Sequence, residues 1–514
     1  MASIKNKPDI SATMPGLAHS GVQMLNAITA KKIWAESVIH YGFGGADTLS
    51  FDKEFARAYK QMFGKNAYPD DDFFFADLTE RAFTMIDAVT RLDFQRTDQL
   101  DVVDLVITST SDKPRSSTEG FFEFPGSSTH EYADGYWSIG AFNSGLNYLK
   151  KKAELGGGEY ANWTIIHEIG HSLGLKHTHK ESNGKPLDTL GKHLDNEKYS
   201  VMSYNPASDP MNHGHAVSMM ALDIASLQAL YGAEDYATGN STYTFTSARS
   251  AALNLDEGNV TIGRAFYCIW DSGGEDTIRF GGGNESVLIN LNAATLNTGS
   301  VSSDLRAIFA DIRSTDLFKS FSSQLRQEIV DQWHHAGGFF SQVLVEKGGK
   351  YKGEAGGFSI AHGAVIENAV GGNGNDMLIG NSHANRLDGN GGNDVLHGGA
   401  GNDVLHGHAG KDILFGGAGN DVLDGGARDD VLEGGAGADR FVFSKGYGLD
   451  VIVDFTHGED IIDLRGLGAF RTFSDLESAM WEEDEFTVIE VGADMLALYA
   501  ISISELTASD FWLV

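Results

Sequence analysis

Residues 398–403 read Gly-Gly-Ala-Gly-Asn-Asp, and residues 416–421 repeat the same six letters. Both copies open a nine-residue unit that recurs from Gly371 to Val442, with glycines, an aspartate and an aliphatic residue at fixed positions. A flexible low-complexity linker does not keep an aspartate and an aliphatic residue in register. The repeat therefore predicts an all-β parallel β-roll, built from tight turns and short strands with the aliphatic residue inside.

The turns of this repeat predict calcium sites, and the pattern is that of the RTX calcium-binding repeat. Glycine lets the backbone turn tightly and aim carbonyl oxygens at one point, and aspartate supplies the charge that a hard cation requires. Short strands are expected at 404–405 and 422–423. Two turns depart from the pattern, because Asn385 replaces an aspartate and Arg428 replaces a glycine. The expected calcium ligands of the repeat are Gly372, Gly374, Asp376, Gly392, Asp394, Gly399, Gly401, Asp403, Gly410, Asp412, Gly417, Gly419, Asp421, Asp430, Gly435, Gly437 and Asp439.

A second motif lies at 167–177, which reads His-Glu-Ile-Gly-His-Ser-Leu-Gly-Leu-Lys-His. His167 and His171 are four residues apart and share one face of a helix. Gly174 can end that helix and turn the chain so that His177 returns to the same point. Three imidazoles with an open fourth position predict a catalytic zinc site, in which Glu168 acts on a water without being a ligand. An amphipathic helix with two surface histidines explains the shorter His-Glu-x-x-His, but not the extension to His177.

Residues 200–204, Ser-Val-Met-Ser-Tyr, follow this motif, and together the two segments resemble the metzincins. Within that clan the chain is most similar to the serralysin family of secreted bacterial proteases. The resemblance implies that Met202 packs beneath the histidines. It also implies that Tyr204 is a fifth, movable zinc ligand that stabilises the oxyanion. The alternatives are ordinary core packing for Met202 and a buried, hydrogen-bonded hydroxyl for Tyr204. The resemblance covers most of residues 160–514 and, more weakly, the first third.

The same resemblance implies calcium ligands outside the repeats. They come from three short segments, although Ala237 stands where the family has an arginine. The implied ligands are Gly239, Asp271, Gly273, Gly274, Asp276 and Glu367.

Composition excludes some classes of protein. The 514 residues include 38 basic and 71 acidic side chains, a formal charge of −33, which argues against nucleic-acid binding. Part of this charge lies in the repeats, where calcium would neutralise it. Cys268 is the only cysteine, so no internal disulfide can form, and it is expected to be a small buried apolar residue.

The ends of the chain indicate the route of export. The amino terminus lacks the pattern of a signal peptide, and no stretch has transmembrane length. Residues 510–514, Asp-Phe-Trp-Leu-Val, resemble the uncleaved carboxyl-terminal signal of type I (ABC-transporter) export. A final buried strand would look similar. Joined to the repeats, this tail predicts a secreted bacterial protein and a type I secretion apparatus as a partner.

The expected architecture is an α+β metzincin zinc protease domain at 21–240, followed by an all-β parallel β-roll (RTX) domain at 241–514. Residues 1–20 are expected to be a propeptide, and about 460–514 to hold the export signal. Helices are expected near 53–63, 73–92 and 222–232, a strand near 102–108, and an edge strand for extended substrates at 136–139.

Residues 296–357 have no expected counterpart in the family. Apolar residues between 304 and 333 recur at helical spacing, which predicts one or two surface helices packed on the roll. A lid or docking element is the alternative. His334 and His335 adjoin this segment, but neighbours on a helix diverge, so neither is expected to be a metal ligand.

These observations predict a secreted, monomeric zinc endopeptidase that is stabilised by calcium and acts on proteins or peptides. His167, His171, His177 and Tyr204 would hold the zinc, and Glu168 would be the general base. A small protein inhibitor is a further partner that the resemblance allows. Two rivals stay open: a narrow processing protease with the insert as its specificity device, and an RTX adhesion or binding protein.

Overall fold

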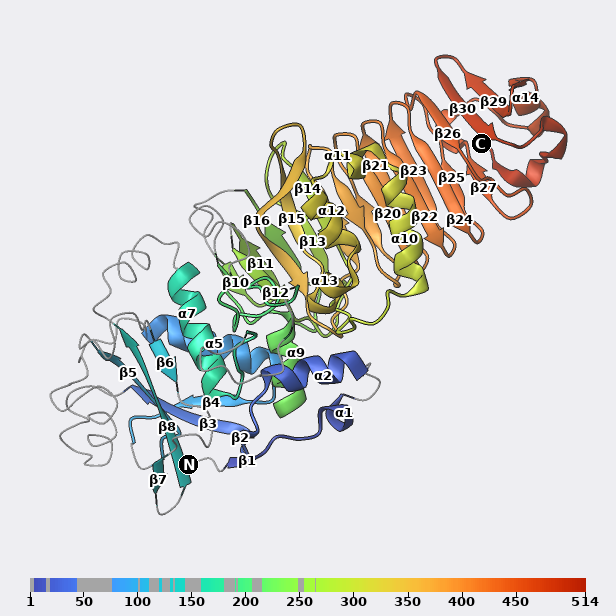
Figure 1. Cartoon of the computed structure of the whole chain (residues 1–514). Coiled ribbons are helices and arrows are strands. Elements are labelled where there is room, and N and C mark those ends of the chain that lie inside the picture. The colour runs from blue at the N-terminus through green and yellow to red at the C-terminus, as the bar shows by residue number, and fades with distance from the viewer. Residues whose placement is uncertain are drawn as a thin grey trace.

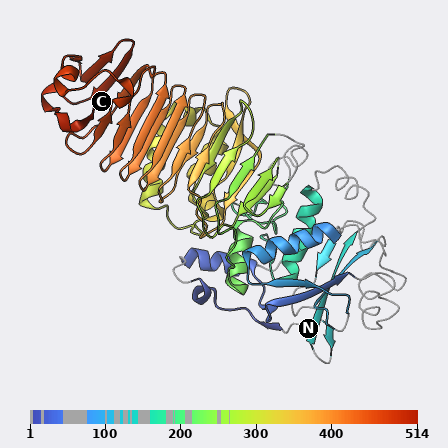
Figure 2. The ribbon, with the colours of Figure 1, turned by 180° about the vertical axis from the view of Figure 1, so that it is seen from behind.

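Two units follow one another along the chain, an α/β unit and a long β-roll (Figures 1 and 2). The computed structural model describes residues 4–14, 19–43, 76–99, 102–110, 120–122, 130–132, 135–143, 159–179, 190, 193–205, 215–247, 254–263 and 265–514. The expected helix near 53–63 lies outside the described residues. None of the helices in the described ranges is long and apolar enough to cross a membrane.

The N-terminal unit, from β1 to α9, combines a small mixed sheet with helices. Its helices are α1 (Ile10–Thr13), α2 (His19–Ile28), α5 (Ala76–Val89), α7 (Glu159–Ser172) and α9 (Ala221–Tyr231). Its strands are β1 (Ile4–Asn6), β2 (Lys32–Trp34), β3 (Val38–Phe43), β4 (Asp93–Arg96), β5 (Leu105–Thr110), β6 (Gly120–Phe122), β7 (His130–Tyr132) and β8 (Gly135–Asn143). The main sheet has the order β4-β3-β5-β8-β6, and β7 also pairs with β8.

Three sequence predictions for this unit are confirmed and one is wrong. The helices α5 and α9 and the strand β5 lie where they were expected. Residues 136–139, however, are not an edge strand. In the sheet order β8 lies between β5 and β6. Tyr136 and Trp137 pair with β7, Ser138 and Ile139 pair with β5, and β6 pairs with residues 140–142. Alternating polarity indicates a strand but not the number of its neighbours, since pairing depends on segments distant in the sequence.

The predicted parallel roll is confirmed. It consists of an 11-stranded and a 12-stranded sheet between which the chain alternates. Its strands outside the insert are β9 (Thr242–Phe245), β10 (Asn254–Asp256), β11 (Asn259–Ile262), β12 (Phe266–Ile269), β13 (Thr277–Phe280), β14 (Ser286–Asn290), β17 (Asn368–Val370), β18 (Met377–Ile379), β19 (Arg386–Asp388), β20 (Val395–Ala400), β21 (Val404–Ala409), β22 (Ile413–Ala418), β23 (Val422–Ala427), β24 (Val431–Ala436), β25 (Arg440–Val442), β26 (Leu449–Ile452), β27 (Ile461–Asp463), β28 (Met480–Glu483), β29 (Phe486–Val491), β30 (Asp494–Tyr499) and β31 (Phe511–Trp512).

Two nonapeptides make one coil of the roll. In β21 and β23, Val404 pairs with Val422, and in β20 and β22, Val395 pairs with Ile413, both 18 residues apart. The aliphatic residue of each unit fills the space between the sheets, as the repeat predicts. Its members from 378 to 441 are all at most 1% exposed: Leu378, Leu387, Leu396, Leu405, Leu414, Leu423, Leu432 and Phe441.

The segment 296–357 contains more helices than expected. They are α10 (Ser303–Ser314), α11 (Asp316–Ser320), α12 (Ser323–Val330) and α13 (Gln332–Gly337), followed by the hairpin β15 (Ser341–Glu346) and β16 (Tyr351–Ile360). The hairpin pairs with β14 and β12 inside the 12-stranded sheet. Apolar residues of the helices, including Ile308, Phe309 and Ile329, pack on Met377 and Phe415 of that sheet's outer face. We call α10–α13 the insert helices.

The last residues of the chain are part of the roll. Phe511 and Trp512 form β31, which pairs with β27, and the Phe511 side chain is buried. The helix α14 (Phe473–Glu477) lies at the same end of the molecule (Figure 1). Cys268 is buried and has no disulfide partner, as expected.

Candidate zinc and calcium centres

The helix α7 and the turn after it bring three histidines together. His167 and His171 project from one face of α7, and Gly174 follows with a φ of +96°, in the left-handed region that favours glycine. The N–H of Leu175 donates to the carbonyl of Gly170 at 2.8 Å, which closes the helix end. Trp34 Nε1 and Tyr231 Oη donate to the last carbonyls, those of Ser172 and Leu173. The reversed chain then carries His177 back toward the helix.

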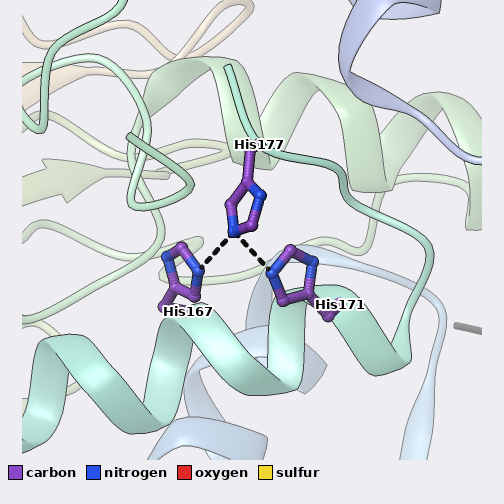
Figure 3. A group of neighbouring side chains, drawn as sticks. All are labelled: His167, His171 and His177. Carbon is purple, nitrogen blue, oxygen red and sulfur yellow. Dashed lines mark hydrogen bonds between the residues drawn. The ribbon is translucent and has the colours of Figure 1, made fainter. Parts of the chain in front are cut away.

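The three ring nitrogens converge on one point (Figure 3). His177 Nε2 lies 3.2 Å from His167 Nε2 and 3.0 Å from His171 Nε2. Zinc–nitrogen bonds of about 2.0–2.1 Å in a tetrahedral site place ligand atoms about 3.3 Å apart. The spacing of the three nitrogens therefore matches that of ligands on a single ion.

The hydrogen bonds of the histidines fix their tautomers. His167 Nδ1 lies 2.7 Å from the carbonyl oxygen of Val201, and His171 Nδ1 lies 2.8 Å from that of Leu175. A carbonyl oxygen can only accept, so each Nδ1 carries the proton and each Nε2 presents a lone pair. Burial lowers the pKa of His167 to about 3 and that of His171 well below its usual value. Two neutral imidazoles whose Nε2 lone pairs both point toward His177 Nε2 fit a bound cation, and the N₃ donor set fits zinc.

Residues 200–203 pack against the histidine-bearing helix α7, and hydrogen bonds to Asp223 fix the position of this segment. Asp223 is fully buried in α9 and accepts from Ser200 Oγ at 2.6 Å, Val201 N at 2.7 Å and Met220 N at 3.0 Å. Burial raises its pKa to about 6 in spite of these bonds. The carbonyl oxygen of Val201 accepts a hydrogen bond from His167 Nδ1–H. Because Asp223 fixes the backbone of Val201, it also positions His167, one of the three histidines of the zinc site. This role was not predicted from the sequence, although Asp223 is the one charged residue of α9.

Glu168 and Tyr204 lie beside the three histidines. Glu168 is buried and follows His167 on α7. Tyr204 is 55% exposed, so it is not the buried tyrosine of the alternative reading. Its ring stacks on His167 with centroids 5.2 Å apart, and the centroid of His177 is 4.7 Å away. His179, which was not predicted to lie at this site, stacks its ring on that of His177 with centroids 5.0 Å apart.

We expect Gly170→Ala to disturb the zinc centre from below. Met202 is fully buried, and a Cβ at position 170 would lie only 2.7 Å from its Sδ. Overpacking of this kind costs about 1–3 kcal/mol. The midpoint temperature of thermal unfolding and the affinity for zinc should both decrease. In a Met202→Ala background, which lacks the Sδ atom, Gly170→Ala should cause no further loss of stability. If Gly170→Ala destabilises that background as much as it destabilises the wild type, the explanation is contradicted.

The aspartates of the roll form two ladders, one along each sheet. The N–H of each aspartate donates at 2.8 Å to Oδ1 of the aspartate one coil later. One ladder links Asp376, Asp394, Asp412 and Asp430, and the other links Asp403, Asp421 and Asp439. The ladders continue to Asp450 and Asp460, which were not predicted because their spacings of 20 and 21 residues depart from the 18-residue period of the coil.

The second carboxylate oxygen of these aspartates faces the turns. Among the described residues, Oδ2 of Asp394, Asp403, Asp412, Asp421, Asp430, Asp439 and Asp450 is buried without a hydrogen-bond partner. A Cβ on Gly398 would lie 2.6 Å from the carbonyl oxygen of Gly416 and against Asp403 Oδ2, so both oxygens border one small space. Unpartnered carboxylate oxygens beside carbonyl oxygens, around a space that admits no side chain, fit calcium. The first glycine of each unit, such as Gly398, was not among the predicted calcium ligands.

Burial acts strongly on these carboxylates. It raises the pKa of Asp394 to about 9, aided by the charge of Asp376, and it raises the pKa of Asp403 and Asp430 to about 7. A charged carboxylate is costly there unless a cation is bound.

The residues expected to bind calcium before the repeats also lie together. Asp276 N donates to Glu367 Oε2 at 2.8 Å, and a Cβ on Gly274 would lie 2.6 Å from the carbonyl oxygen of Gly239 and 2.9 Å from Asp276 Oδ1. Asp276 Oδ2 is another buried oxygen without a partner in the described part of the chain. Asp271 Oδ2 instead accepts from Tyr243 Oη at 2.7 Å.

Arg428 occupies a position that suits glycine. Its φ is +93°, a conformation that costs an L-residue about 1 kcal/mol or more. We expect Arg428→Gly, which restores the repeat, to raise the free energy of unfolding of the roll by about 1 kcal/mol and to strengthen calcium binding. Calcium titrations followed by circular dichroism would measure both. Arg428→Ala removes the same side chain but keeps the strain, so an equal gain in that control would refute the backbone explanation.

Comparison with known proteins agrees with both centres. The Matrixin family model, Peptidase_M10, matches residues 67–183, which contain the three histidines. The model of the RTX calcium-binding nonapeptide repeat matches residues 363–396, 388–423 and 415–448.

Several curated proteins are similar to this chain over part of its length. Metalloprotease AprA of Pseudomonas entomophila is 34% identical over 45% of this chain and 39% of its own length. Serralysin C of Dickeya chrysanthemi is 32% identical over 49% of this chain and 43% of its own. Serralysin of Photorhabdus laumondii is 29% identical over 55% of this chain and 51% of its own. The chain thus spans about half the length of these relatives or less.

A solved structure of the extracellular lipase LipA from Serratia marcescens aligns with 54% of this chain and 38% of that chain. The sequence identity is 14% and the TM-score 0.23, which is too low to indicate a shared fold. The histidine centre, the aspartate ladders and the family matches agree with one another. The chain thus contains a segment that matches the matrixin (M10) metalloprotease model, RTX calcium-binding repeats, and a partial similarity to the serralysins.

Proposed function

We propose that this chain is a secreted zinc endopeptidase that hydrolyses peptide bonds in protein substrates and is stabilised by calcium. The convergence of the Nε2 atoms of His167, His171 and His177 within 3.0–3.2 Å supports this assignment most directly. We assign these three histidines as the zinc ligands, with Tyr204 as a fifth ligand. When bound, zinc would supply a Lewis acid for the scissile carbonyl and a water with a pKa near 7.

The side chains around the histidines would carry the proton transfers. Glu168 would accept the proton of the attacking water and deliver it to the amine that leaves. Tyr204 is exposed enough to turn away when substrate arrives, and its hydroxyl would then donate to the developing oxyanion. Asp223 and Met202 would hold the histidines in place and would not touch the substrate.

Calcium would control where the protein folds. Extracellular calcium modules bind with dissociation constants of roughly 10⁻⁴ to 10⁻³ M, well above the calcium concentration of a cytosol. The roll would therefore stay unfolded inside the cell, pass through a type I apparatus, and fold outside as calcium binds. The ladders of buried aspartates are the feature on which this proposal depends. A roll that folds in calcium-free buffer at neutral pH would contradict it.

Casein hydrolysis is the experiment that tests the peptidase. The purified full chain is assayed in millimolar calcium, alone and with a zinc-selective chelator while calcium stays in excess. We expect cleavage that the chelator abolishes and added zinc restores. If folded, zinc-loaded protein cleaves neither casein nor a panel of unrelated proteins, the broad endopeptidase is refuted in favour of a narrow processing protease or a binding protein.

A further inference from the structure

A second group of metal-ligating side chains lies between the N-terminal unit and the insert helices. It consists of His193, Asp331 and His334, whose ligand atoms all lie within 4.8 Å of one another. His193 belongs to the segment that precedes the turn at 200–204. Asp331 is the C-cap of α12, and His334 lies three residues later in α13. In Figure 1, α12 and α13 lie on the roll, on the side that meets the N-terminal unit.

His334 is held so that one of its nitrogens is available to an ion. Its Nδ1 lies 2.7 Å from the hydroxyl oxygen of Tyr199, a buried residue of the N-terminal unit. With Nδ1–H donating to that oxygen, Nε2 keeps a lone pair for a metal. Metal-binding histidines commonly have their second nitrogen oriented by such a hydrogen bond. The ring of His193 meets that of His334 at 82°, with centroids 6.0 Å apart.

The neighbouring histidine faces elsewhere. His335 Nε2 lies 2.6 Å from the carbonyl oxygen of Ile329, and its ring stacks on Phe339 with centroids 4.2 Å apart. The side chains of His334 and His335 point in different directions, as expected for neighbours on a helix. His334, however, points toward two other potential metal ligands, His193 and Asp331. That outcome depends on the docking of the insert, which the sequence pattern does not contain.

We propose that His193, Asp331 and His334 bind a second zinc ion, which ties the insert helices to the N-terminal unit. Two imidazoles and one carboxylate are a donor set that zinc accepts, with a fourth position left for water. Ligand atoms around zinc are about 3.3 Å apart, so the group must contract by roughly 1.5 Å. His193 is exposed and can supply this movement by rotating its side chain.

The site would reinforce contacts that already join the two parts. Lys198 Nζ lies 3.1 Å from Glu328 Oε2 of α12. A Cβ on Gly337 would lie 2.5 Å from the ring of Tyr199, so the helix and that ring are in close contact. The Tyr199 carbonyl accepts from Leu222 N of α9 at 3.1 Å. A zinc ion bound here would therefore brace the segment that leads into the turn beneath the histidines of α7.

Zinc stoichiometry of the full chain tests the proposal without any activity assay. Protein in excess calcium, which keeps the roll sites occupied, is equilibrated with zinc and analysed by mass spectrometry of its metal content. We expect two zinc ions per chain in the wild type and one in each of His193→Ala, His334→Ala and His167→Ala. His193→Ala/His167→Ala should bind none. The control His383→Ala removes an exposed histidine of the roll and should keep two.

His193→Ala is the deciding variant, because its side chain is exposed and its loss leaves the core intact. Circular dichroism should match that of the wild type, and the thermal midpoint should lose the increase that the second zinc equivalent gives. A wild type that binds only one zinc, or a His193→Ala variant that still binds two, would overturn the proposal. So would a group that takes up calcium and not zinc.

Discussion

Glu168→Gln is expected to abolish proteolysis while leaving the zinc in place. A positioned general base contributes about 10²- to 10⁴-fold to the rate, so kcat on a casein-derived peptide should fall by that factor with little change in KM. Zinc content should be unchanged, because the proposed ligands are the three imidazoles and Tyr204. Glutamine is close to isosteric with glutamate, which keeps α7 packed. Steady-state kinetics and metal analysis of the same preparation measure both results.

Two other variants serve as controls for this experiment. His171→Ala should lose zinc as well as activity, which separates loss of the metal from loss of the base. Glu234→Gln carries the same chemical change at an exposed position and should retain full activity. If the Glu168→Gln protein retained more than about a tenth of the wild-type kcat, the proton transfer would have to be carried out by another group.

Removal of calcium at neutral pH is expected to unfold the roll, and acidic pH is expected to keep the calcium-free roll folded. The buried ladder aspartates have pKa values raised to about 6 to 9, against an ordinary value near 4. A carboxyl group whose pKa is raised by folding stabilises the folded form when it is protonated. Its contribution is complete below about pH 4 and is lost as the pH rises through 6 to 9. The calcium-free roll should therefore be folded near pH 4 to 5 and unfolded above pH 8.

Calcium should remove this pH dependence, since it neutralises the carboxylates that acid would protonate. At a calcium concentration ten times its dissociation constant, each site contributes about 1.4 kcal/mol, and several sites together on the order of 10 kcal/mol. Circular dichroism of the full chain across pH 4–9, with zinc present and calcium absent or in excess, tests both statements. A calcium-free roll that is more stable at pH 8 than at pH 5 would show that the ladder aspartates are not protonated in the folded state.

A matched pair of variants isolates the ladder from general acidity. Asp430 is a buried ladder member, whereas its neighbour Asp429 is exposed and pairs with Lys411, which lowers its pKa. Asp430→Asn should weaken calcium binding and reduce the pH dependence. Asp429→Asn makes the same change in charge one residue away and should do neither.

The zinc motif could be predicted in full because its geometry is local. His167, His171 and the bend at Gly174 lie within one helix and its termination, and a helix has the same periodicity in every fold. The partners of the site could not be predicted. The carbonyl of Val201 and the carboxylate of Asp223 come from segments 34 and 52–56 residues away, and no spacing rule connects them to His167. The same limit explains why residues 136–139 were predicted to be an edge strand.

The roll and the first zinc centre follow from sequence patterns, because both are repeated or local motifs whose residues meet through fixed helical or nonapeptide periods. Tertiary structure alone decided how the ladders continue to Asp450 and Asp460 outside the repeat, and where the insert helices dock. It also decided that His334, and not His335, faces His193 and Asp331. Those contacts depend on packing between distant segments, such as the burial of Ile308, Phe309 and Ile329 against the roll.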